Sequence, residues 1–442
     1  MRIALVGGGG FRTPSVHDAL VQISSEVPIE PLVLHDVDGR RLERIAAVIE
    51  AANGARGELG VRTTTDLDEA LDGADVVFVA IRPGGLEARV VDEAVPLELG
   101  VLGQETVGPG GVAFALRTIP EVVQIAETVR GRAPGAWFVN LTNPVGVVTE
   151  AARVVLGSKA VGVCDSPTAL WRNASAAMGR SATTLRPSYA GLNHLGWLTA
   201  LRDGDHDVLP TLIGEHLDEV HEARLAGIAS VRARGLIPNE YLTYYRDTDA
   251  VIRAFRRDGS RAQVLAAQQA RFYDARSQDP TAALTAWRAA KDERHGTYMS
   301  EARDQGDRGS AITDEGGLGY GNVAAAFVRA VANDTRERMI LGVGNDGAVP
   351  WLDNRATVEI PCEVGADGPE PEPQSTLPPP ERELMERVRE AERATSVAAE
   401  TPSVRSLVDA IAAHPVVPSR ELAERIADAY LERHDGMRER FA

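Results

Sequence analysis

Cysteine and lysine are scarce in this sequence. Cys164 and Cys362 are the only cysteines, so we expect no disulfide framework. Lys159 and Lys291 are the only lysines, which leaves few candidates for a Schiff-base nucleophile. No apolar run approaches the roughly 18–20 residues that span a bilayer, and the apolar stretch at residues 3–6 is too short for a signal peptide. We therefore expect a cytoplasmic protein.

Basic residues are also fewer than acidic residues. The 47 basic and 64 acidic residues give a net charge of −17. A chain this acidic repels phosphate backbones and anionic lipid, so neither a nucleic acid nor a membrane is an expected partner. The 44% of hydrophobic residues supply a core, and 442 residues fit two or three domains.

The first 165 residues predict alternating strands and helices. Short apolar runs at 2–7, 30–35, 75–81, 136–141 and 160–163 are typical of strands covered on both faces. Amphipathic helical patterns at 39–52, 110–130 and 144–155 lie between them. This alternation predicts an α/β Rossmann domain, a doubly wound parallel sheet, over residues 1–165.

Residues 166–442 have a mixed character, which predicts a second, α+β domain for substrate, metal and subunit contacts. We expect strands at 187–201 and 357–364, a hairpin within 198–207, and helices over 212–302, 381–399 and 421–434. The stretch 369–380 is rich in proline and indicates a connector or surface loop.

A glycine run follows the first predicted strand and precedes a helix that begins near Thr13. Glycines there let backbone N–H groups approach a pyrophosphate, and the run consists of Gly7, Gly8, Gly9 and Gly10. Asp36 ends the second strand, where a carboxylate suits the hydroxyls of an unphosphorylated ribose. The pattern predicts NAD as cofactor, whereas Asp38 also fits plain turn chemistry.

Polar segments lie at the ends of several predicted strands, where open α/β sheets bind ligands. They are RPGGLEAR (82–89), QETVGPGG (104–111), NLTNP (140–144) and GLNHLGW (191–197). Cys164 and His194 suit a divalent transition metal, although two protein ligands make an incomplete site. Composition alone favours a buried free cysteine and a core histidine over a metal site.

The motifs together resemble glycoside hydrolase family 4, the NAD- and manganese-dependent glycosidases. VGGGG, HDVD, RPGGLEAR, ELGVLGQETVGPGGVAFALRTIP, NLTNPVGVVTEAA, VCDSP, GLNHLGW and IPNEYLTYY carry the resemblance, in this order. The last segment is most similar to the 6-phospho-β-glucosidase branch. The resemblance implies a phosphorylated disaccharide or aryl glucoside as substrate, and a homodimer or homotetramer.

The resemblance also implies an unusual mechanism, outside the two-carboxylate scheme of most glycosidases. NAD⁺ takes a hydride from C3 of the sugar, and Mn²⁺ or a similar ion polarises the resulting ketone. A base removes the C2 proton, the C1 substituent is eliminated, water adds, and NADH returns the hydride.

Site residues follow from the matching motifs. Cys164 and His194 correspond to the metal ligands and Tyr241 to the base, with Tyr244 and Tyr245 close enough to confuse the assignment. Asp165 corresponds to the acid for the leaving oxygen, although it also suits a helix N-cap.

Further residues are expected to contact ligands. We expect the cofactor to contact Ile81, Arg82 and Asn140. Asn143 and Asn193 are candidate sugar contacts, for which capping or turn bonding is a competing role. Arg89 suits a sugar phosphate, with a salt bridge to Glu87 or Glu93 as the alternative.

One departure bears on the substrate. Asp314 and Glu315 occupy positions where the family usually has a basic pair, and two acids there would oppose a dianionic phosphate. A non-phosphorylated or α-linked sugar, such as a galactoside or glucuronide, is therefore an alternative. Two other classes compete: a lactate/malate-type NAD dehydrogenase, and a non-catalytic sensor of NAD or sugar.

Overall fold

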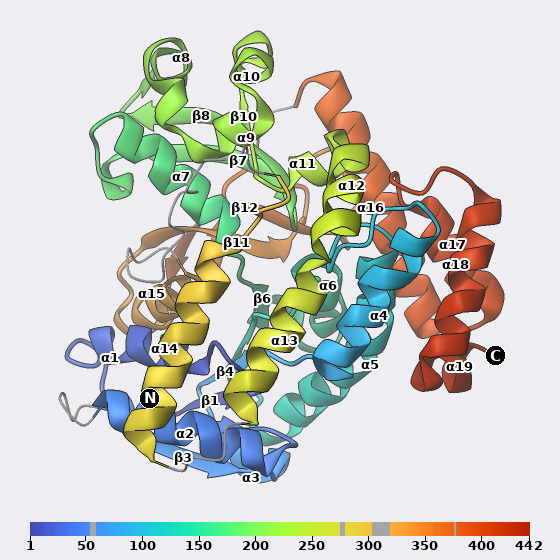
Figure 1. Ribbon diagram of the computed structural model, residues 1–442. Coiled ribbons are helices and arrows are strands. Elements are labelled where there is room, and N and C mark those ends of the chain that lie inside the picture. Colours follow the sequence, from blue (N-terminus) through green and yellow to red (C-terminus); the bar gives the residue numbers. More distant parts are fainter. Residues whose placement is uncertain (54–58, 275–278, 303–318, 375–376) are drawn as a thin grey trace.

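The computed structural model describes residues 1–53, 59–274, 279–302, 319–374 and 377–442. Its first half forms a parallel sheet in the order β3-β2-β1-β4-β5-β6 (Figure 1). The strands are β1 (Ile3–Val6), β2 (Leu32–His35), β3 (Val61–Thr64), β4 (Val76–Val79), β5 (Trp137–Asn140) and β6 (Ala160–Gly162). This order reverses between β1 and β4, as in a doubly wound Rossmann sheet, and confirms the predicted fold class.

The second half extends the same sheet with antiparallel strands. β11 (Glu337–Gly344) pairs with β6, and the order continues β12-β7-β8-β10. These strands are β12 (Thr357–Gly365), β7 (Arg186–Leu192), β8 (Leu195–Asp203) and β10 (Ile237–Pro238), with β9 (His206–Asp207) and β13 (Gly368–Pro371) at their sides. The division at residue 165 stays a prediction, because the sheet is continuous across it.

Helices cover both faces of the parallel sheet. Alternate residues of β1 show this, since Ile3 and Leu5 join one hydrophobic core while Ala4 and Val6 join the other. The first core contains side chains of α1 (Thr13–Ile23), α2 (Gly39–Asn53), α14 (Pro280–Gly296) and α15 (Tyr320–Asn333). The second contains α5 (Pro109–Arg132), α6 (Val145–Leu156) and the four C-terminal helices α16 (Pro379–Glu400), α17 (Val404–Ala413), α18 (Arg420–Arg433) and α19 (Asp435–Phe441).

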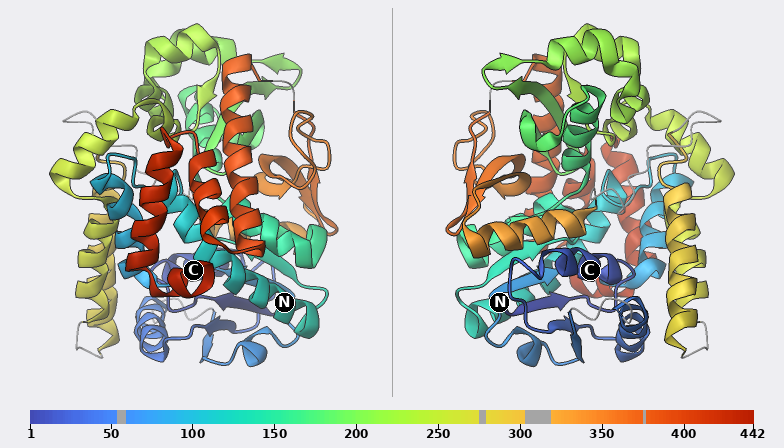
Figure 2. Two further views of the ribbon diagram at one scale, coloured as in Figure 1. Left: turned by 90° about the vertical axis from the view of Figure 1, so that its right-hand side faces the viewer. Right: turned by 90° about the vertical axis from the view of Figure 1, so that its left-hand side faces the viewer.

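The remaining helices lie in the connections between these elements, and Ala70 and Leu71 of the first one join the second core. They are α3 (Leu67–Leu71), α4 (Gly85–Glu98), α7 (Ser166–Ala177), α8 (Leu209–Thr211), α9 (His221–Ala226), α10 (Ile228–Arg234), α11 (Leu242–Arg246), α12 (Thr248–Asp258) and α13 (Arg261–Tyr273). Short 3₁₀ turns occupy Gly157–Lys159, Ala182–Thr184 and Leu217–Glu219, and Leu212–His216 is a π turn. Figure 2 shows the C-terminal helices gathered on one flank of the molecule.

The proline-rich stretch requires a correction. Its first part is not a connector, because β13 pairs with β12 through Pro369 opposite Val364 and Pro371 opposite Cys362. Proline is tolerated there because β13 is an edge strand. The backbone N–H that proline lacks is not needed for pairing with a further strand. In the described part of the chain, no helix is long and apolar enough to cross a membrane.

Candidate active site

A cavity of about 1090 Å³ opens at the carboxyl ends of the parallel strands. Residues that end or follow β1, β2, β4 and β6 line it, namely Gly7, Asp36, Ile81 and Cys164. Helices α13 and α14, from the second half of the chain, supply further lining residues. The cavity therefore joins the predicted cofactor loop to the predicted metal ligands.

The glycine run contributes to this cavity only in part. Gly7 and Gly10 line it, and a Cβ on Gly7 would lie 2.3 Å from the Ala80 carbonyl oxygen at a φ of +90°. Gly8 and Gly9 are not among the described lining residues, and their expected contact with NAD stays a prediction. Their lack of a side chain is needed elsewhere, because added Cβ atoms would meet the side chains of Leu34 and Asp36.

Asp36 lines the cavity at the end of β2. Its carboxylate accepts hydrogen bonds from the backbone N–H groups of Gly9 (3.0 Å) and Asp38 (3.1 Å). The carboxylate is thus held in place at the position where a ribose hydroxyl is expected. The glycine loop with this acid fits a dinucleotide.

Of the other expected cofactor contacts, Ile81 and Arg82 line the cavity and Asn140 does not belong to its described wall. Asn140 is fully buried, donates to the Thr142 carbonyl and Thr149 hydroxyl, and accepts from the Thr142 N–H. These bonds fold the turn after β5. A direct cofactor contact at Asn140 stays a prediction, and these bonds already engage its side-chain amide.

Cys164 follows β6 and is buried in the cavity wall. Burial raises the pKa of its thiol well above the ordinary value, and the charges of Glu359 and Asp165 act in the same direction. A cation bound at the thiol would reverse this preference and favour the thiolate.

His194 occupies the two-residue turn between β7 and β8, with a φ of 61°. Its Nδ1 lies 2.7 Å from the Thr106 hydroxyl oxygen, and its ring stacks on Tyr241 with centroids 3.6 Å apart. Burial lowers the pKa of His194 to about 3, against the charge of Glu105. The imidazole is therefore neutral, as a metal ligand must be.

Three tyrosines are candidates for the base, and they differ in position and in hydrogen-bond partners. Tyr241 and Tyr244 line the cavity, whereas Tyr245 lies outside its described wall and stacks on His414. The Tyr244 hydroxyl donates to Glu301 at 2.6 Å. Burial raises the pKa of Tyr241 well above its ordinary value, with the charge of Glu240 adding to the effect.

A chain of polar groups continues behind Tyr241. Its hydroxyl lies 3.4 Å from that of Tyr298, which donates to Glu240 at 2.8 Å, and Ser166 donates to the same carboxylate at 3.0 Å. Burial, with the charge of Glu222, raises the pKa of Glu240 to about 8. The sequence motifs did not identify Tyr298, because it lies 57 residues from Tyr241.

Asp165 lines the same cavity at the start of α7. It stands at the N-cap position, but within the described structure its side chain makes no capping hydrogen bond. Its carboxylate lies 3.9 Å from the Arg12 guanidinium. The capping role weighed from sequence is therefore absent here.

Arg89 lines the cavity within a buried ion network. Its guanidinium contacts Glu93 at 2.8 Å and Glu105 at 2.9 Å, and Arg82 contacts Glu105 at 2.5 Å. Burial alone would raise the pKa of Glu105, yet Arg82 and Arg89 hold it well below its ordinary value. The salt bridge between Arg89 and Glu93, the alternative role expected from the sequence, is thus present. A phosphate would have to compete with Glu93 and Glu105 for the Arg89 guanidinium.

The two asparagines expected at the sugar differ. Asn143 lines the cavity, and within the described residues its side chain has no hydrogen bond, so its amide is available to a ligand. Asn193 is absent from the described cavity wall; it accepts from the Val145 N–H and donates to Glu359. These bonds hold the β7–β8 turn, and a sugar contact at Asn193 stays a prediction.

Arg12, Arg261 and Arg294 also line the cavity, and the sequence motifs missed the last two. Among the described residues, the Arg294 side chain has no hydrogen-bond or ion-pair partner. Burial lowers its pKa to about 9, and the charges of Arg12 and Arg261 add to the effect. Only the frequency of arginine in the predicted helical region 212–302 indicates Arg261 and Arg294. Asp314 and Glu315, weighed against a phosphate, lie outside the described residues.

Metal-binding capacity is limited to a partial donor set. No group of three or more His, Cys, Asp or Glu side chains in the described ranges is placed to hold a metal. Cys164 and His194 supply one soft and one borderline donor in the same cavity. Such a pair fits a metal that keeps positions open for substrate oxygens.

Comparisons with known proteins cover nearly the whole chain. Residues 2–178 match the family described as Family 4 glycosyl hydrolase, and residues 189–417 match its C-terminal domain. A 6-phospho-alpha-glucosidase of Leptotrichia buccalis is 32% identical over 97% of both chains.

Two solved structures are similar along their full length. A 6-phospho-alpha-glucosidase from gut microorganisms, in complex with NAD and Mn²⁺, is 27% identical with a TM-score of 0.81 and covers 99% of this chain and 98% of its own. The 6-phospho-beta glucosidase of Thermotoga maritima, with manganese, NAD⁺ and glucose-6-phosphate, is 25% identical with a TM-score of 0.83 over 99% of both chains.

Proposed function

The chain belongs to family 4 of the glycosyl hydrolases, and from this premise we propose that it is an NAD- and Mn²⁺-dependent 6-phospho-β-glucosidase. The similar proteins named above act on 6-phospho-α- or 6-phospho-β-glucosides. The segment IPNEYLTYY, which contains Tyr241, favours the β-linked branch. The 32% identical relative favours an α-linked substrate as the second candidate.

The proposal of a phosphorylated substrate rests on the surroundings of Arg294. An arginine without a partner among the described residues, beside Arg12 and Arg261 in the cavity wall, is an electrostatically unfavourable arrangement. A dianionic sugar phosphate would neutralise this cluster and accept bidentate hydrogen bonds from a guanidinium. Arg89 is less suited to the role, since Glu93 and Glu105 already occupy it.

Cofactor and metal would occupy the two ends of the cavity. Gly7, Gly10, Asp36, Ile81 and Arg82 would hold NAD⁺, and Cys164 with His194 would hold Mn²⁺. When bound, NAD⁺ supplies a reversible hydride acceptor for C3 of the sugar, and Mn²⁺ supplies a Lewis acid for its C2 and C3 oxygens.

The remaining roles belong to side chains of the chain itself. Tyr241 would take the C2 proton as a phenolate, a form that the charge of a bound Mn²⁺ would favour, and its hydroxyl oxygen lies 3.4 Å from that of Tyr298. Asp165 would give a proton to the leaving oxygen. Asn143, with its amide available in the cavity, would orient a sugar hydroxyl.

Hydrolysis of matched p-nitrophenyl glucosides tests the substrate. The α- and β-glucosides and their 6-phosphates are offered to metal-free enzyme, with NAD⁺ and Mn²⁺ added separately and together. We expect turnover only with both, and only on the β-linked 6-phosphate. Turnover of the α-linked phosphate would establish the second candidate, and turnover of a plain glucoside alone would remove the phosphate from the proposal.

An Arg294→Gln variant connects this result to the structure. Loss of one guanidinium–phosphate contact should raise KM for the phosphorylated substrate about 10- to 100-fold, in line with the roughly 1.5–3 kcal/mol of a charged hydrogen bond. Arg288→Gln, on the same helix and outside the described cavity wall, is the matched control. Equal KM values for the two variants would contradict the role of Arg294.

A further inference from the structure

We propose that Thr106, fixed by Gln104, sets the tautomer of His194 and thereby leaves its Nε2 lone pair available to the metal. Thr106 is thus a positioning residue. The inference rests on the proposed metal site, but the tautomer itself is a property of the metal-free protein. The tautomer of His194 follows from which atom accepts the hydroxyl proton of Thr106.

The first step identifies the oxygen of the Gln104 amide. One of its terminal atoms lies 2.7 Å from the backbone nitrogen of Thr106 and 2.8 Å from that of Val107. Both nitrogens carry hydrogen, so the atom that faces them must be an acceptor. It is therefore Oε1, and a flipped amide would turn NH₂ hydrogens against two N–H donors.

The second step assigns the proton of the Thr106 hydroxyl. Its oxygen lies 3.0 Å from Gln104 Oε1, which only accepts, so Thr106 donates in this contact. A hydroxyl has one proton to give. The 2.7 Å contact with His194 Nδ1 must then be donated by the ring.

The third step concerns the other ring nitrogen. A neutral imidazole carries one N–H, and placing it on Nδ1 leaves Nε2 with its lone pair. Were the Thr106 proton directed at Nδ1 instead, Nε2 would carry the hydrogen and neither nitrogen would be free to bind a cation. The Gln104–Thr106 contact therefore decides whether His194 is a competent ligand.

Both partners are held so that the arrangement persists. The His194 ring is buried and stacked on Tyr241, with 7° between the ring planes. The loop that carries Thr106 is anchored where the Gly108 N–H donates to His414 Nε2 at 3.0 Å. Burial, ring stacking and this anchor hold the ring and the loop in these positions.

The test combines ¹⁵N NMR of histidine-labelled, metal-free protein with Mn²⁺ titration followed by EPR. Wild type, Thr106→Val and Thr106→Ser are compared, and His194→Ala identifies the resonances. We expect the Nδ1–H tautomer in wild type and Thr106→Ser, and a mixture of tautomers in Thr106→Val. Mn²⁺ affinity should fall about 10- to 100-fold in Thr106→Val and return in Thr106→Ser.

Two results would overturn the inference: an Nε2–H tautomer in the wild type, or a Thr106→Val spectrum equal to that of wild type in a variant with unchanged circular dichroism. Failure of the proposed metal site looks different. In that case the tautomer pattern would hold while His194→Ala and Cys164→Ser bind Mn²⁺ as wild type does.

Discussion

Glu240 illustrates how burial sets the behaviour of a single residue. Its side chain is 3% exposed, and its pKa is about 8 instead of the ordinary 4.5. The folded chain therefore keeps a proton that the unfolded chain releases between these two values. The contribution of Glu240 to stability falls as pH rises from about 4.5 to 8, and is constant above that range.

A Glu240→Gln variant should remove this slope. Relative to wild type, its free energy of unfolding should increase between pH 5 and pH 8, by about 1.4 kcal/mol per pH unit at most. Urea unfolding at the two pH values measures the change, with the exposed Glu439→Gln as control. A difference from wild type that is the same at both pH values would show that Glu240 does not titrate in this way.

Sequence motifs indicated candidate chemical residues more readily than the residues that position them. Cys164, His194, Tyr241 and Asp165 all line the cavity, because each belongs to a motif at the end of a strand or in a turn. Thr106 lies 88 residues from the histidine it contacts, so no local pattern predicts the pair. Asn193 is similar, since its hydrogen-bond partners, the Val145 N–H and the Glu359 carboxylate, lie 48 and 166 residues away.

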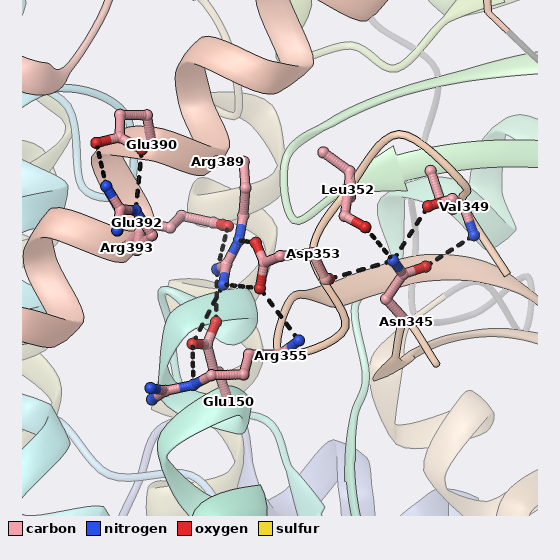
Figure 3. Close-up of polar contacts among 10 residues, drawn as sticks. All are labelled: Glu150, Asn345, Val349, Leu352, Asp353, Arg355, Arg389, Glu390, Glu392 and Arg393. Atoms are coloured by element: carbon pink, nitrogen blue, oxygen red, sulfur yellow. Dashed lines mark hydrogen bonds and ion pairs between the residues drawn. The ribbon is translucent and has the colours of Figure 1, made fainter. Parts of the chain in front are cut away.

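At the scale of elements, one buried arginine joins three segments (Figure 3). Arg389 on α16 contacts Glu150 of α6 at 2.5 Å and Asp353, in the loop between β11 and β12, at 2.7 Å. Glu392, one turn along α16, lies 3.5 Å away. Arg389 is 5% exposed and Glu150 is 4% exposed, so this pair is withdrawn from water, whereas Asp353 is exposed.

Removing Arg389 should therefore be far more harmful than removing a neighbouring surface arginine. Arg389→Met leaves Glu150 and Glu392 without their buried cation, and we expect a loss of about 3–5 kcal/mol in unfolding free energy. Arg393→Met, which breaks an exposed pair with Glu390 on the same helix, should cost about 1 kcal/mol or less. Denaturant unfolding of both variants measures the contrast, and similar losses would contradict it.

Element prediction succeeded where burial gave a clean pattern. The buried strands β1, β4 and β5 and the amphipathic helices α2, α16 and α18 are close to their expected ranges. β3 was missed because its residues alternate little and are mostly exposed. β11 was missed although it is largely buried, since two glycines weaken its strand pattern.

At the scale of the whole molecule, side chains of the second half bind the glycine loop of the first. Tyr273 of α13 donates to the Gly9 carbonyl, and Trp287 of α14 donates to that of Phe11, each at 2.8 Å. Figure 1 shows both helices running beside the parallel sheet. A dinucleotide bound in this loop would thus stabilise contacts between the two halves and not only the first half.

This arrangement predicts the effect of cofactor on thermal stability. A ligand at 100 times its Kd stabilises the folded state by about 2.7 kcal/mol. With roughly 2.1 cal/mol/K of unfolding entropy per residue and 442 residues, NAD⁺ should raise Tm by about 3 °C. NADP⁺ at the same concentration should raise it less, because Asp36 and Asp38 line the cavity where a 2′-phosphate would lie. Calorimetry with the two cofactors measures both shifts, and equal shifts would mean that these carboxylates do not select the ribose.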